Sequence, residues 1–306
     1  MEYSEVTLQR IRTVVDQVTK PKGDFCIVLN GSFARSEAHK KSDIDFWLLI
    51  SDESDPAEAE KYLSEVRCAL TENGFVCPNP EGAFARANIL DKLIGKAGSK
   101  GDDADGITQR MLLLMESTWL VNEDFFVESR NKILAHYCKG LGSEQKQPIY
   151  LLNDLIRYFR MICVNYQYNT GDDGEKWLIR NVKLRHSRVL IYAGLLSLIL
   201  VSSTKDELAE KFILENLDLT PLERVFLLCE AVESSSFDRI ASAYDHFLET
   251  VKEMASVSSD TYEGRHQNPG YRSLRTSSSM ISAELTTLVL ENRRKWHHSI
   301  FEALIF

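Results

Sequence analysis

Two short apolar runs near the start of the chain, joined by a polar segment, limit its fold more than any other feature. Residues 25–29 (FCIVL) and 44–50 (IDFWLLI) have the length and composition of buried strands. An Asn-Gly-Ser turn follows the first run directly, and an Asp-Ile-Asp stretch opens the second. We therefore expect two core strands connected by one or two turns of helix, with glycine, hydroxyl and carboxylate groups in the connection.

Around this pair, the first 144 residues alternate helical patterns with short strand candidates. Apolar residues at helical spacing, with proline, asparagine or glycine at the ends, predict helices over 6–18, 56–72, 107–120 and 123–138. Residues 75–77 are a third strand candidate, and the glycine-rich stretch 95–106 predicts an exposed loop. Glycines and a proline at 140–148 are typical of a linker, so we place one domain at 1–144 and a second at 145–306.

The second domain shows only helical patterns. Apolar stripes predict helices over 152–166, 177–200, 207–217, 222–232, 237–255 and 279–306. Residues 256–278 are rich in serine, glycine and arginine and are expected to form a loop. The predicted fold class is therefore α+β, a mixed sheet with flanking helices, followed by an all-α helix-bundle domain.

Composition supports two folded domains and narrows the partners. The chain has 306 residues, 44% of them hydrophobic, which is enough for two cores. Its net charge of −9 disfavours general nucleic-acid binding and anionic membrane surfaces. The acidic N-terminus lacks a signal-peptide pattern, and six cysteines without a CxxC pair suit reduced thiols, so we expect a cytoplasmic protein without a zinc site. The apolar run 189–201 is shorter than a membrane span and predicts the buried axis of the bundle.

The polar segment between the first two strands has the composition of a metal-nucleotide site. Gly31 and Ser32 offer a close backbone, a hydroxyl and helix N-terminal amides to a phosphate. Asp43 and Asp45 are two residues apart at the start of a strand, so their carboxylates project from one face and suit Mg²⁺. Arg35 is one helical turn further on and is a candidate donor to a triphosphate. The plain alternatives are a capping serine, a solvated acid pair and an Arg35–Glu37 surface ion pair.

These residues carry a family resemblance. The stretch GSFARSEAHKKSDIDF resembles the glycine-serine and Asp-x-Asp signature of the DNA polymerase β-like nucleotidyltransferase superfamily, and is most similar to the branch of the nitrogen-regulatory uridylyltransferases and related uncharacterised bacterial proteins. The resemblance covers roughly residues 24–124. It implies that Gly31 and Ser32 hold phosphates and that Asp43 and Asp45 bind Mg²⁺. The superfamily's third carboxylate is not evident here, where Glu81 and Asp91 are the candidates.

In the helical half, one basic cluster is a candidate for the same nucleotide. Lys176, Arg180, Lys183, Arg185 and Arg188 gather in an otherwise acidic chain, and we take Lys183 as a further cofactor-binding residue. A solvated helix face is the alternative. Two stretches, 130–136 and 180–186, also match a loose arginine-to-histidine spacing of helical ribonucleases.

The sequence thus predicts a Mg²⁺-dependent nucleotidyltransferase that moves a nucleoside monophosphate from ATP or another nucleoside triphosphate to an acceptor hydroxyl, releasing pyrophosphate. The acceptor stays open: a protein, a small molecule, a second nucleotide or an RNA end, with the acidic surface counting against RNA. One alternative is a nucleotide-binding regulatory module without turnover. Another is a helical-domain ribonuclease fused to a nucleotidyltransferase regulator.

Overall fold

The structure is a computed structural model that describes residues 2–77, 84, 86–139, 147–168, 177–254 and 263–305. The chain divides into two compact units, Met1–Lys139 and Gly140–Phe306. The predicted domain boundary between residues 144 and 145 falls within 140–146, outside the described residues, and its position stays a prediction.

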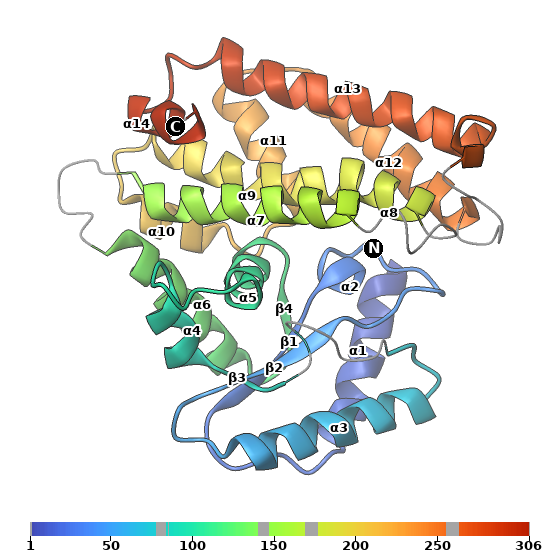
Figure 1. Ribbon diagram of the computed structural model, residues 1–306, viewed down its shortest axis with the longest axis vertical. Coiled ribbons are helices and arrows are strands. Elements are labelled where there is room, and N and C mark those ends of the chain that lie inside the picture. The colour runs from blue at the N-terminus through green and yellow to red at the C-terminus, as the bar shows by residue number, and fades with distance from the viewer. Residues whose placement is uncertain are drawn as a thin grey trace. The chain divides into compact units, whose positions relative to one another are not determined.

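The first unit contains a four-stranded sheet with helices around it (Figure 1). Its elements are α1 (Glu2–Asp16), β1 (Phe25–Leu29), α2 (Gly31–Ala34), β2 (Phe46–Ile50), α3 (Pro56–Glu72), β3 (Asn88–Ile89), α4 (Leu90–Lys96), α5 (Ala104–Met115), β4 (Thr118–Val121) and α6 (Glu123–Cys138). The strand order is β3-β2-β1-β4. Strand β1 pairs antiparallel with β2 and with β4, and β2 pairs parallel with β3.

The two central strands are buried on both faces, which explains why they read as continuous apolar runs. Alternate residues of β1 and β2 join one core with α1 and α3: Phe25, Ile27, Leu29, Phe46, Leu48 and Ile50. Ile44, just before β2, belongs to the same core, so the strand alternation continues back through the Asp-Ile-Asp stretch. The residues between them in sequence lie on the opposite face, where α6 packs on β1.

Strand direction decides which polar segments meet. Because β1 and β2 are antiparallel, the end of β1 and the start of β2 lie at the same end of the sheet, with Leu29 opposite Phe46. The start of β4 lies there too, because Thr118 is opposite Leu29. The starts of β1 and α4 and the end of β2 lie at the other end, because β3 runs parallel to β2.

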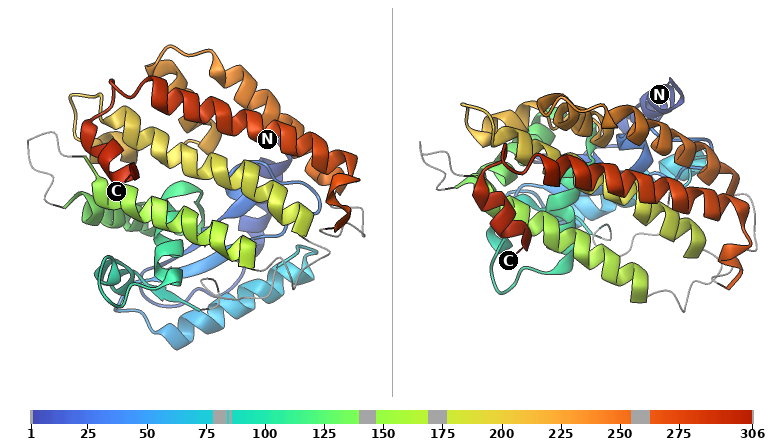
Figure 2. Two further views of the ribbon diagram at one scale, coloured as in Figure 1. Left: turned by 45° about the horizontal axis from the view of Figure 1, so that its top comes forward. Right: turned by 90° about the horizontal axis from the view of Figure 1, so that it is seen from above.

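The second unit is helical within the described residues (Figures 1 and 2). Its elements are α7 (Ile149–Tyr168), α8 (Trp177–Lys183), the π-helical turn η2 (Leu184–Arg188), α9 (Val189–Ser202), α10 (Ala209–Glu215), α11 (Pro221–Ala231), α12 (Ser236–Met254), the 3₁₀ turn η3 (Glu263–His266), α13 (Pro269–Glu291) and α14 (His298–Ile305). Helix α9 packs against α7, α10 and α11. Helix α12 lies along α13, as the orange and red helices in Figure 2 show.

The apolar helix of this unit is explained by its burial. Elements α8, η2 and α9 form one continuous helix, Trp177–Ser202, of 26 residues with a mean hydropathy of 1.5 in its most apolar window. By length and composition alone it could cross a membrane, but 72% of that window is buried inside the unit. A core helix of a bundle is expected to be apolar on all sides, and α9 has this character.

The predicted fold class is confirmed, and the differences concern short strands and the bounds of some helices. Helices α3 and α6 have the predicted bounds. Residues 75–77 are not a strand, although the Val76 carbonyl accepts a hydrogen bond from the Ile44 amide (2.9 Å). The helix predicted over 107–120 ends at Met115 and strand β4 follows. The helix predicted over 279–306 begins earlier, at Pro269, and is broken between Glu291 and His298.

Candidate functional site

The site is centred on the contact between the glycine after β1 and the second aspartate before β2. Gly31 has a φ of +74°, and a Cβ atom added to it would lie 2.8 Å from Oδ2 of Asp45. The left-handed backbone favours glycine, and a side chain at this position would have to displace the Asp45 carboxylate. The Asn30 amide donates to the Asp45 carbonyl (2.8 Å), which continues the β1–β2 pairing by one residue. Sequence pattern and sheet geometry therefore bring the Gly-Ser turn and the Asp-Ile-Asp stretch together.

The two aspartates share a face but differ in exposure. Strand β2 begins at Phe46, later than predicted, yet burial of Ile44 in the core leaves Asp43 and Asp45 on the opposite face by alternation. Asp43 is exposed and Asp45 half-buried. Among the described residues Asp43 has no ion-pair partner. It lies near enough to Cys77 to affect that thiol. Burial raises the pKa of the Cys77 thiol, and the negative charge of Asp43 adds to that rise.

The Asn30 side chain connects the Gly-Ser turn to β2 and to the segment before β4. Its Oδ1 accepts a hydrogen bond from the Trp47 indole (2.6 Å), and its Nδ2 donates to the Glu116 carbonyl (3.0 Å). The Asn30 side chain is buried, so these hydrogen bonds satisfy it and tie β1 to β2 and to the segment before β4. Asn30 therefore acts as a structural anchor, and its side chain does not cap α2.

Ser32 offers the only side-chain hydroxyl of the α2 turn. It is half-buried, and no hydrogen bond of its hydroxyl is found among the described residues. Its carbonyl accepts from the Glu37 amide (2.8 Å), which closes the turn after α2. Helix α2 has only four residues, so the backbone and hydroxyl at its start, and not a helix dipole, are the groups offered to a phosphate.

Arg35 is held by two carboxylates. Its Nε donates to Glu37 (2.8 Å), and one Nη donates to Glu116. The Arg35 and Glu116 side chains are 9% and 1% exposed, so the ion pair is buried and not a surface pair. Arg35 thus links the turn after α2 to the segment before β4. The role of Arg35 as a phosphate ligand stays a prediction. The ion pair with Glu37 that the sequence offered as the alternative is present, and a second pair with Glu116 was not expected.

Glu116 was missed as a site residue by the sequence analysis. It directly follows α5 as its C-cap residue, where the apolar pattern looks like uninterrupted helix, and only the β1–β4 pairing brings it beside Arg35. The available signal was an acidic residue directly after the five-residue apolar run 111–115.

Of the two candidates for a third carboxylate, the structure describes Asp91 only, and it lies away from Asp43 and Asp45. Asp91 is exposed at the start of α4, directly after β3. The pKa of Lys132 is raised, first by its hydrogen bond with Glu128 and then by the charges of Asp91 and Asp24. Asp91 and Asp24, which precedes β1, therefore both lie near Lys132. Asp91 is therefore at the opposite end of the sheet from Asp45. Glu81 lies outside the described residues. Within the described ranges no group of three or more His, Cys, Asp or Glu side chains is arranged to hold a metal ion.

The remaining predicted residues are Lys183 and the residues of the two arginine-to-histidine stretches. Lys183 is exposed at the end of α8, and its role toward a nucleotide stays a prediction. His186 is fully buried and stacked on Phe247, with ring centroids 4.5 Å apart, and burial lowers its pKa to about 4. Arg130 is also buried and lies over the Phe126 ring, in the first unit and not in the helical one. A ribonuclease needs an accessible histidine, so the 180–186 match is explained by core packing.

Comparison with known proteins locates the family relation in the same segment. A family model described as "Putative nucleotidyltransferase DUF294" matches residues 2–86. The match spans α1 to α3 and includes the Gly-Ser turn and both aspartates. It confirms the predicted relation of this region to the nucleotidyltransferase superfamily, while the branch stays a prediction. No curated protein matches the chain.

Proposed function

We propose that the N-terminal unit, whose first 86 residues carry the nucleotidyltransferase family match, transfers a nucleoside monophosphate from a Mg²⁺-bound nucleoside triphosphate to an acceptor hydroxyl. The observation that carries the proposal is the close approach of Gly31 to the Asp45 carboxylate, 2.8 Å from the position of an added Cβ. A turn that can contact phosphate oxygens thus lies against a carboxylate that can bind their counter-ion.

The donor set fits magnesium. Mg²⁺ is bound in proteins by one or two carboxylates together with substrate phosphates and water, and Asp43 and Asp45 supply two carboxylates on one face. The exposure of Asp43 leaves room for water and phosphate ligands. When bound, the ion supplies charge neutralisation for the phosphates during the transfer.

The chain's own groups are assigned complementary roles. The Gly31 backbone and the Ser32 hydroxyl contact the terminal phosphates of the nucleotide, and Lys183 is retained as a proposed further contact. Arg35 is a positioning residue, because its guanidinium is bound to Glu37 and Glu116 and thereby holds the end of the α2 turn. Orientation and charge stabilisation of this kind account for most of the catalysis of phosphoryl transfer.

The reaction exchanges one phosphorus–oxygen bond for another. The acceptor oxygen forms a bond to the α-phosphorus, the bond from the α-phosphorus to the bridging oxygen breaks, and pyrophosphate leaves with that electron pair. The acceptor proton passes to solvent or to a base that we do not assign. The acceptor is proposed to be a protein or a small molecule in the cytoplasm, since the net charge of −9 disfavours nucleic acid.

A substitution at Ser32 tests the phosphate-binding role. Ser32→Ala removes a hydroxyl that has no hydrogen bond to other described residues, so the fold is expected to persist while nucleotide affinity falls about tenfold, the effect of one hydrogen bond to a charged group. Calorimetry with each Mg-NTP and pyrophosphate release in the presence of lysate fractions measure both quantities. Ser64→Ala, on the exposed face of α3, is the matched control and is expected to behave as the parent chain. Unchanged affinity of Ser32→Ala contradicts the assignment.

A second function, a nucleotide-binding regulatory module, is favoured by one observation. Among the described residues no third acidic group lies with Asp43 and Asp45. The superfamily that the sequence resembles uses a third carboxylate for transfer. The same two measurements separate the functions. Nucleotide binding without pyrophosphate release or intact-mass change of any acceptor supports the module, and release supports the transferase.

A further inference from the structure

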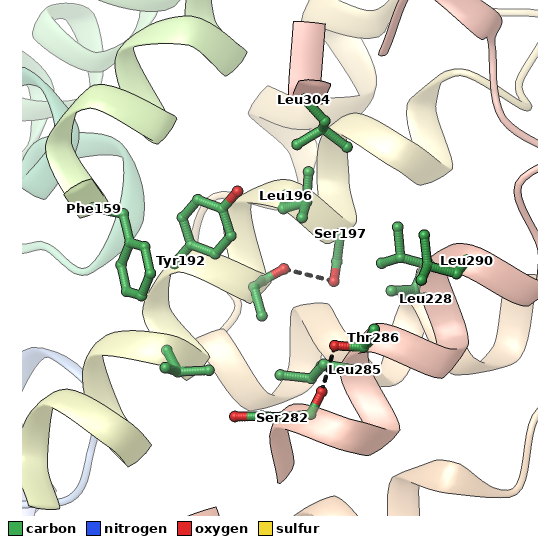
Figure 3. A pocket seen from close by; sticks show the side chains of 13 residues that line it. Phe159, Tyr192, Leu196, Ser197, Leu228, Ser282, Leu285, Thr286, Leu290 and Leu304 are labelled. Atoms are coloured by element: carbon green, nitrogen blue, oxygen red, sulfur yellow. Dashed lines mark hydrogen bonds between the residues drawn. The ribbon is translucent and has the colours of Figure 1, made fainter. Parts of the chain in front are cut away.

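The helical unit contains a cavity of about 370 Å³ that the proposed nucleotide chemistry does not use (Figure 3). Helices α7, α9, α11, α13 and α14 contribute to it, through Phe159, Val189, Tyr192, Ala193, Leu196, Ser197, Leu228, Ser282, Leu285, Thr286, Val289, Leu290 and Leu304. Ligand sites in proteins typically measure about 300–1,000 Å³, so the cavity is large enough for a small molecule. Its rim reaches the surface, because Leu290 is 51% exposed.

The walls of the cavity are apolar, and two of its hydroxyls are already bound. Ser197 Oγ donates to the Ala193 carbonyl (2.7 Å), and Thr286 Oγ1 donates to the Ser282 carbonyl (2.7 Å), as the dashed lines in Figure 3 show. Water needs two to four polar partners to be stable in a cavity, and these walls offer few. An apolar group is therefore the favoured occupant of the interior.

One side of the cavity offers a polar anchor. Tyr192 packs on Phe159, with ring centroids 4.6 Å apart, and no hydrogen bond of its hydroxyl is found among the described residues. Arg160 follows Phe159 in α7, is exposed, and has no ion-pair partner within the described ranges. Burial raises the pKa of Tyr192 and the positive charge of Arg160 opposes that rise, so the two groups lie close enough to interact. Tyr192 therefore supplies a hydroxyl donor in the cavity wall, and Arg160 supplies an exposed cation directly after the lining residue Phe159.

We propose that this cavity binds a small amphiphilic carboxylate, with its alkyl chain between the five helices and its carboxylate at Arg160 and Tyr192. Charge complementarity selects an anion over a neutral or cationic head, and a carboxylate accepts hydrogen bonds from both a guanidinium and a hydroxyl. The site lies entirely within the second unit, so its test is independent of nucleotide chemistry.

Calorimetric titration of the full chain with decanoate tests whether the cavity binds this ligand. We expect saturable one-to-one binding, at least tenfold weaker in Ser197→Leu, because the added side chain occupies the cavity where Ser197 is 1% exposed. Thr286→Phe, at an exposed rim position, is a second blocking variant that tests the same point if Ser197→Leu does not fold. Absence of saturable binding, or binding that survives both variants, overturns the proposal.

Two arginines one helical turn apart test the polar anchor. Arg160→Gln removes the unpaired cation and is expected to weaken decanoate binding about tenfold, the contribution of a hydrogen bond to a charged group. Arg157→Gln is the matched control, because Arg157 is already paired with Asp154 (2.7 Å), and it is expected to change the affinity less than twofold. Decanol is expected to bind more weakly than decanoate to the parent chain and equally to both variants. Equal decanoate affinity in the Arg160→Gln and Arg157→Gln proteins contradicts the carboxylate assignment.

Discussion

At the scale of single residues, the account depends on Gly31, whose backbone is left-handed and lies against the Asp45 carboxylate. Gly31→Ala places a methyl group 2.8 Å from Asp45 Oδ2 in a left-handed backbone with a φ of +74°. We expect the carboxylate to be displaced and Mg-NTP affinity to fall at least tenfold. The backbone strain itself costs about 1–2 kcal/mol of stability. Urea denaturation and nucleotide titration measure the two effects separately.

Gly74 provides the matched control for that substitution. It also has a left-handed backbone, with a φ of +80°, but a Cβ there meets nothing within 4 Å. Gly74→Ala is therefore expected to lose similar stability and to keep nucleotide affinity. If both variants bind nucleotide equally well, the contact between Gly31 and Asp45 has no functional importance.

The residue scale also shows what a sequence pattern can predict of a site. Gly31, Ser32, Asp43 and Asp45 were identifiable because chemistry and strand position coincide within a short segment. The second partner of Arg35 was not, because Glu116 is 81 residues away in sequence and meets it only through the pairing of β1 with β4.

At the scale of elements, the loop before α5, which the sequence predicts to be exposed, is anchored by a buried ion pair. Arg110 Nη2 donates to both Asp102 oxygens (2.9 and 2.8 Å), and both side chains are 1% exposed. Asp102→Asn leaves the guanidinium without its counter-charge and is expected to cost about 3–5 kcal/mol of unfolding free energy. Lys96→Gln, which removes an exposed pair with Asp103 (3.5 Å), is expected to cost about 0.5 kcal/mol. Similar denaturation midpoints for the two variants contradict this view of the loop.

The π-helical turn η2 makes the helical unit sensitive to acid. Folding lowers the His186 pKa from 6.5 to about 4, mainly by burial, although Nδ1 donates to the Val182 carbonyl (2.7 Å). The positive charge of Arg185 and the nearby His246 lower it further. Between these two pKa values the unfolded chain binds a proton that the folded chain does not, so stability falls as pH decreases from 6.5 to 4, by about 3 kcal/mol in total.

His186→Gln removes this titration while keeping a donor for the Val182 carbonyl. The pH dependence of the unfolding free energy is expected to become shallower by one proton between pH 6.5 and 4, as measured by urea denaturation at several pH values. A variant with the same slope as the parent chain in that window contradicts the assignment of the acid sensitivity to His186.

Elements with strong end signals were predictable, and those defined by distant pairing were not. Helix α3 begins at Pro56 behind the capping Asp55, and helix α6 begins behind the capping Asn122, which explains their correct bounds. Strand β4 follows α5 after two residues, so its apolar residues continue the helical pattern, and β3 has only two residues. Their strand character comes from pairing with β1 and β2, which the local sequence does not encode.

At the scale of the whole molecule, sheet topology assigns each carboxylate to one end of the first unit. The antiparallel β1–β2 pair gathers the Gly-Ser turn, both aspartates and the start of β4 at one end, and the parallel β2–β3 pair sends Asp91 to the other. The second unit contributes a separate apolar cavity. The two proposals therefore concern chemically different sites, one proposed for phosphates and a cation and one proposed for an alkyl chain.

Pyrophosphate release with Mg-NTP, compared between two aspartate variants, tests the central claim most directly. The double variant Asp43→Asn, Asp45→Asn keeps side-chain volume and removes both charges, while Asp91→Asn removes an exposed carboxylate at the opposite end of the sheet. We predict that the double variant loses Mg²⁺-dependent release at least a hundredfold while retaining its unfolding midpoint, and that Asp91→Asn releases pyrophosphate at the parent rate. Full release by the double variant, or its loss in Asp91→Asn alone, would contradict the account.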